Sequence, residues 1–153
     1  MAIGLPDLAT LLADKPLIKP AIFFGLILAV YEIWLVHIDE HSFRGWFGHA
    51  LHAVPIIIIF TFISMNLHFA LSKLGLVLPF GKTGEMTARV ILAIIIAVQV
   101  VAKSALFGGV RGAGRVRGTH ETAIHGLIIG ILVGASPYIW LLLQNLPLLS
   151  FLK

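Results

Sequence analysis

Six of the chain's seven histidines fall in two short stretches, and acidic residues accompany them in both. Neutral imidazole and carboxylate groups together form binding sites for zinc, iron, manganese or copper. The six candidate metal ligands are His37, His41, His49, His52, His120 and His125. The sequence therefore predicts a site for a divalent transition metal, although a haem or a pigment is an alternative group that histidines would also ligate.

The spacing within these stretches suits ligands that act in pairs. His37 and His41 are four residues apart, and His49 and His52 are three apart. Glu121 and His125 are again four residues apart. Residues at these separations share one side of a helix, so each pair would present two ligands together. Because a tetrahedral ion takes four ligands, the remaining histidines would orient those four or bind a second ion. The alternative is that these are interfacial histidines that only pack.

Three acids are the candidate catalytic groups. Glu40 and Glu121 stand beside the histidines, where either would act as the base that activates a metal-bound water. Glu32 lies inside an apolar run, where an acid is costly and usually faces protein or a watery cavity rather than lipid. We expect Glu32 to be a ligand, a proton carrier or the partner of a buried cation.

Three arginines are concentrated in a glycine-rich segment, residues 108–118. It contains Arg111, Arg115 and Arg117. Flexible backbone amides and arginines both favour phosphate, so this segment is predicted to hold an anionic group of a cofactor, substrate or lipid. The alternative is a solvated loop without a ligand.

The composition indicates which solvent surrounds the folded chain. It is 59% hydrophobic and only 12% charged, with a mean hydropathy of +1.02. Soluble domains carry roughly twice that charged fraction, and much of any folded surface must meet the solvent. The lipid bilayer is therefore the expected partner. There is no cysteine, which excludes thiolate ligands and disulfides. The net charge of +4 is spread over loops, so no nucleic-acid partner is expected.

Four apolar runs are long enough to cross a bilayer as helices, which takes about 20 residues. They cover residues 21–38, 46–71, 86–107 and 124–143. The runs are continuous rather than alternating, which favours helices over a barrel. The sequence therefore predicts an all-α, multi-pass integral membrane protein, with residues 1–153 forming one transmembrane domain. Leucines at helical spacing before residue 16 predict a short interfacial helix there, or an irregular end.

Spans that cross the membrane in alternating directions would form an antiparallel four-helix bundle. This topology determines at which membrane face the histidines lie. The connection between the first two spans and that between the last two would share one membrane face. All six candidate ligands belong to those regions, while His68 lies towards the opposite face, near Asn66. We therefore expect one shared polar pocket at one face. Basic residues divide evenly between the two faces, so the orientation stays open.

Other polar positions within the spans have structural interpretations. Lys103 and Arg89 are the candidate cations for Glu32, with Arg89 alternatively extending to the opposite face. Gln99 and Asn66 are expected to hydrogen-bond between helices.

Three glycines spaced four apart form a groove on the last span. They are Gly126, Gly130 and Gly134. Small residues at this spacing allow close helix approach. The groove would receive a neighbouring helix or another subunit of a homo- or hetero-oligomer.

Three function classes follow from these features. The first is a metal-dependent membrane enzyme that acts on a lipidic or small substrate. The second is an accessory subunit of a larger membrane complex, possessing histidines that ligate haem or pigment or merely pack. The third is an oligomeric metal-ion or proton transporter or channel, with Glu32 in the path.

Overall fold

The computed structural model describes residues 16–39, 43–77, 81–109 and 119–152. Within these ranges, the side chains of residues 36, 38, 39, 43–52, 82, 102–109 and 119–123 are outside the description. The described part is all helical, as predicted, and contains no strand. Its elements are α2 (Ile18–Asp39), α3 (Phe43–Met65), α4 (Leu67–Lys73), α5 (Lys82–Gly109), α6 (Thr119–Leu143) and the 3₁₀ helix η1 (Pro147–Leu152). The predicted interfacial helix before residue 16 lies outside the described residues.

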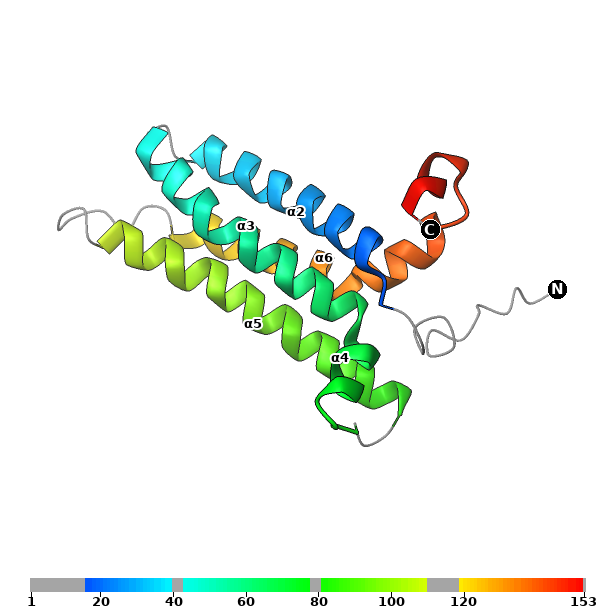
Figure 1. Ribbon diagram of the computed structural model, residues 1–153. Coiled ribbons are helices and arrows are strands. Elements are labelled where there is room, and N and C mark those ends of the chain that lie inside the picture. The colour runs from blue at the N-terminus through cyan, green and yellow to red at the C-terminus, as the bar shows by residue number, and fades with distance from the viewer. Residues whose placement is uncertain (1–15, 40–42, 78–80, 110–118, 153) are drawn as a thin grey trace.

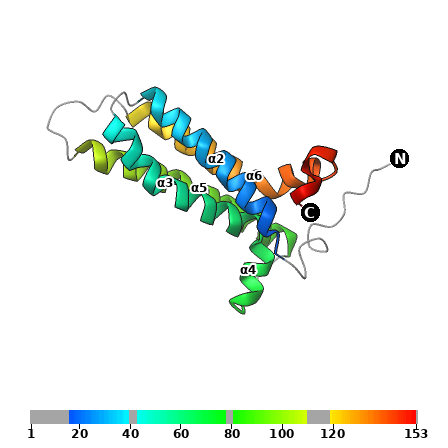
Figure 2. The same cartoon turned by 45° about the horizontal axis from the view of Figure 1, so that its top comes forward.

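The four long helices lie side by side, and each runs opposite to the one before it (Figures 1 and 2). They form two close pairs, because α2 packs mainly on α3 and α5 packs mainly on α6. Contacts between the pairs are less extensive and involve α3 and α6 most. The ends of α2 and α5 and the beginnings of α3 and α6 lie at one end of the molecule, and α4 lies at the other.

Length and apolar composition support membrane insertion. Three described helices contain segments that qualify as spans: Ile18–Leu35, Thr83–Val101 and Ile124–Leu143. A bent pair of segments, Ala53–Met65 and Leu67–Lys73, brings the number to four if it is one span. Large apolar side chains such as Ile91, Ile94 and Val98 are exposed along α5, as is expected of a surface that meets lipid.

The second predicted span is not one continuous helix. α3 ends at Met65, and α4 is turned away from it by 86°. The break is at Asn66, whose φ of −116° and ψ of 30° are not helical. Its side-chain amide donates to the carbonyl of Phe62 at 2.9 Å, and its Oδ1 accepts from the backbone N–H of Leu17 at 2.5 Å. Asparagine competes for backbone hydrogen bonds in this way, whereas Pro55 stays inside α3.

A layer of fully buried aliphatic side chains joins the two helix pairs. We call this set the middle layer; its members, all at 0% exposure, are Ile57, Ile96, Ile129 and Val133. They belong to one apolar cluster that includes Leu28 and Ala29 of α2. A second cluster, nearer the chain's carboxyl end, packs Phe24, Met65 and Trp140 together.

The predicted glycine groove is filled by a helix of the same chain. A Cβ atom at Gly126 would lie 2.8 Å from the carbonyl oxygen of Ala97, and one at Gly130 would overlap the carbonyl oxygen of Ala93. Gly134 faces Ala93 as well. Of the two occupants that the sequence left open, the structure shows α5, so an oligomer would have to use another surface.

Candidate functional site

Glu32 is buried in the protein interior, at 1% exposure. It follows Leu28 and Ala29, which belong to the same apolar cluster as the middle layer, by about one turn of α2. The midpoint of α2 falls between these two residues, so Glu32 lies about 5 Å from it along the axis. If α2 crosses a hydrocarbon core of about 30 Å, the carboxylate is roughly 10 Å below the nearer surface. The expectation that Glu32 faces protein rather than lipid is confirmed; its catalytic role stays a prediction.

The histidine-bearing helix ends lie at the same end of the molecule (Figure 1). However, most of the predicted ligands cannot be placed against one another. The side chains of His41, His49, His52 and His120 lie outside the described part, as do those of the predicted bases Glu40 and Glu121. The arginines of the glycine-rich segment, Arg111, Arg115 and Arg117, lie outside it too, as does the side chain of Lys103.

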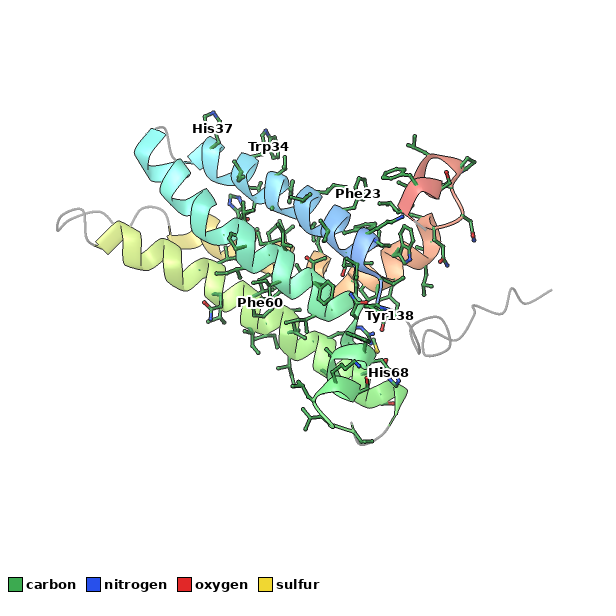
Figure 3. All side chains as sticks on the ribbon, in the orientation of Figure 1. Phe23, Trp34, His37, Phe60, His68 and Tyr138 are labelled. Atoms are coloured by element: carbon green, nitrogen blue, oxygen red, sulfur yellow. The ribbon has the colours of Figure 1, made fainter. Side chains whose placement is uncertain are left out.

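Two of the six predicted metal ligands have described side chains. His37 is exposed, and in Figure 3 its ring points away from α3. His125 is half-buried near the beginning of α6. Within the described side chains, no group of three or more histidine, aspartate or glutamate residues is arranged to hold a metal ion. The metal site therefore stays a prediction.

At the opposite end the structure shows a polar cluster, which we call the α4-end cluster: His68, Glu85 and Arg89. One carboxylate joins the other two groups, because Oε2 of Glu85 accepts from Nη1 of Arg89 at 3.3 Å and Oε1 lies 3.4 Å from Nδ1 of His68. Exposure falls from 45% at the His68 side chain to 17% at that of Glu85 and 3% at that of Arg89. The cluster therefore leads from the molecular surface into the interior.

The Arg89 guanidinium of α5 contacts two other helices. Its Nε donates to the backbone carbonyl of Ser64 on α3 at 3.4 Å, and its central carbon lies 5.8 Å from the ring centroid of Tyr138 on α6. Figure 3 labels Tyr138 and His68 near this end of the helices. Within the described part, the Nη2 atom of Arg89 and the hydroxyl oxygens of Thr61 and Ser64 have no hydrogen-bond partner.

Both interpretations of Arg89 that were made from the sequence are wrong. The residue neither extends out of the fold nor pairs with Glu32. The α2–α3 register is fixed where Gly25 meets Ile58, since a Cβ at Gly25 would lie 3.0 Å from the Ile58 Cα. Counting along the helices from this contact, Glu32 lies about 10 Å towards one end and Ser64, which contacts Arg89, about 9 Å towards the other. The separation of Glu85 and Arg89 by four residues was the overlooked signal, since such pairs meet on a helix.

No protein-family model, curated protein or solved structure matches this chain. The function therefore has to be argued from the residues and their geometry.

Proposed function

We propose that the chain is a four-span membrane transporter for protons or a metal cation, with Glu32 as the carrier group. One observation carries this proposal: Glu32 is 1% exposed at a depth where an acid costs about 2.5–3.5 kcal/mol even on lenient insertion scales. Ionisable side chains kept inside spans at such a cost mark ion pathways and proton relays.

The proposal requires α2, α3, α5 and α6 each to cross the bilayer as an antiparallel four-helix bundle. The length of α3 supports a crossing that ends before the bend at Asn66. From residue 46, where the predicted span begins, to its end at Met65, α3 is about 30 Å long, which matches a hydrocarbon core of about 30 Å. α4 is then not needed to complete the span.

The packing suggests how access to Glu32 would alternate. The fully buried side chains Ile57, Ile96 and Ile129 belong to the cluster of Leu28 and Ala29, which precede Glu32 on α2. On this side of Glu32 they would close the interior. The helices are bound more extensively within the α2–α3 and α5–α6 pairs than between them. Rocking of one pair against the other would open this layer with each pair kept intact, as in transporters that move one bundle against another.

The test uses the full chain in phosphatidylcholine vesicles. A pH-sensitive dye reports proton entry driven by a valinomycin potassium potential, and a zinc- or manganese-sensitive dye reports cation entry. We expect flux of one of these ions, its loss in Glu32→Gln and its retention in Glu32→Asp, which keeps the titratable group. Absence of both fluxes in the wild type, or full flux in Glu32→Gln, would overturn the proposal.

The second candidate is the metal-dependent membrane enzyme, and one observation favours it. The helix ends that carry the predicted ligands lie together at one end of the molecule. There, Glu40 or Glu121 would serve as the base and Arg111, Arg115 and Arg117 would hold an anionic group. Elemental analysis of the purified wild type, His41→Ala and His125→Ala tests it. Stoichiometric metal that is lost in the variants supports a metal site, and none in the wild type removes it.

The visible spectrum of the same preparation addresses the remaining class. A Soret band would show that histidines ligate haem, which favours an accessory subunit of a larger membrane complex. Such a subunit would also fail the vesicle assay.

A further inference from the structure

α4 and the residues that follow it leave an apolar surface outside the helical core. Leu74 is 71% exposed, Leu76 is 55% exposed and Val77 is 93% exposed. These values are not those of a segment packed against its own chain. Some other medium or molecule must cover these side chains, because water solvates three neighbouring aliphatic groups poorly.

The bend after α3 favours a position of this surface at the membrane boundary. α3 is long enough to reach the end of the hydrocarbon core, and α4 then turns by 86°. A helix that turns by a right angle at the end of a span runs along the membrane plane. Figure 2 shows α4 projecting sideways from the end of α3.

A helix cap directs the apolar residues out of α4. Gly75 has a φ of +66°, a left-handed conformation that costs glycine little. The N–H of Leu76 donates to the carbonyl of Leu71 at 2.9 Å, and the N–H of Gly75 donates to that of Ser72 at 3.2 Å. These two bonds form a Schellman motif, which ends the helix and satisfies its last carbonyls. The chain beyond it then presents Leu76 and Val77 outwards.

Two contacts hold the beginning of α4 against the rest of the protein. His68 on its first turn lies beside Glu85 of α5, and Asn66 before it accepts a hydrogen bond from Leu17, next to the first residue of α2. On the last turn, the ammonium of Lys73 lies 5.6 Å from the ring centroid of Phe69. Lysine and aromatic side chains are both typical of a membrane interface.

We propose that α4 and residues 74–77 lie in the membrane interface, with Leu74, Leu76 and Val77 inserted among the acyl chains just below the lipid headgroups. Lipid is the occupant that the position favours, because the surface continues from spans already surrounded by lipid. A second copy of the chain is the competing occupant. This inference rests on membrane insertion and is independent of Glu32.

A single nitroxide label tests the proposal, since the chain has no cysteine of its own. Val77→Cys is labelled in the full chain in phosphatidylcholine nanodiscs, with Ile94→Cys as the control, which is 58% exposed halfway along α5. Collisions with oxygen and with a water-soluble nickel chelate report the depth of each label. Size-exclusion chromatography first shows that both variants keep the wild-type elution volume.

We expect the Val77 label to prefer oxygen over the nickel chelate, at a depth shallower than the Ile94 label. A preference for nickel equal to that of a free aqueous nitroxide would place the segment in water and overturn the proposal. An immobile label shielded from both reagents would indicate a protein partner and would overturn it too.

Discussion

Glu32 and Arg89 are both at most 3% exposed, but the two halves of the molecule bury them in different ways. Arg89 has a carboxylate partner one turn earlier, a backbone carbonyl and an aromatic face around it. Glu32 follows an apolar cluster in the other half, close to the midpoint of α2. Through the Ser64 carbonyl and the Tyr138 ring, Arg89 connects α5 to α3 and α6. An acid near the middle of a span is costly, and this cost is the reason why we propose the carrier role for Glu32 rather than for Arg89.

The largest effect on stability is expected from Glu85→Leu. It removes the carboxylate partner of Arg89, which is 3% exposed, and leaves a buried cation. Breaking a buried pair in this way costs about 3 kcal/mol or more of unfolding free energy. Glu32→Gln, which preserves shape in the other half, should cost less than about 1 kcal/mol while ion flux is lost. Denaturation by sodium dodecyl sulfate in mixed micelles measures both.

The double variant Glu85→Leu with Arg89→Met is the control. If the loss comes from the unpaired cation, removing the cation should restore most of the stability, because apolar replacements of buried ion pairs are often neutral. A double variant as unstable as Glu85→Leu would show that the α4-end cluster stabilises through its shape rather than its charge. The contrast between the two halves would then fail.

Gly130→Ala tests how closely α5 and α6 pack within their pair. A Cβ at this position meets the carbonyl oxygen of Ala93, which belongs to backbone and cannot rotate away. Overpacking of this kind costs about 1–3 kcal/mol. Gly25→Ala, at the α2–α3 contact, has 3.0 Å to the Ile58 Cα and should cost less. Equal stability of Gly130→Ala and the wild type would mean that α5 and α6 separate easily.

Much of the fold was predictable because a membrane span has a simple sequence signature. The predicted span at 21–38 corresponds to Ile18–Asp39, and that at 124–143 to Thr119–Leu143. The predicted span at 46–71 is interrupted at Asn66, because hydropathy does not detect a single asparagine whose side chain bonds the backbone one turn earlier. The prediction that Gly126, Gly130 and Gly134 admit a close helix is confirmed, although spacing alone could not identify that helix as α5.

The candidate site was less predictable, for a physical reason. Residue type and spacing show which histidines share a helical side, but the assembly of a metal site depends on distances across helices. Arg89 illustrates the same limit, since its burial depends on Ser64 and Tyr138 of other helices. Only its pairing with Glu85 was local enough to be found from the sequence.

The smallest expected effect on stability distinguishes two amide side chains for which the sequence predicted the same role. Asn66 and Gln99 were both expected to bond between helices. Asn66 is 1% exposed and accepts from the Leu17 N–H, whereas Gln99 is exposed on α5. Asn66→Ala leaves that N–H without its acceptor and should lower the unfolding free energy by about 1–2 kcal/mol, while Gln99→Ala should change it by less than about 0.5 kcal/mol.

Asn66→Ala also removes the amide that competes with helical hydrogen bonds at the bend between α3 and α4. The nitroxide at position 77 should therefore become deeper or more mobile in Asn66→Ala and stay unchanged in Gln99→Ala. If Asn66→Ala altered neither stability nor the label, the bend would be set by the contacts of α4 with α5, and the α4 half would keep its geometry without Asn66.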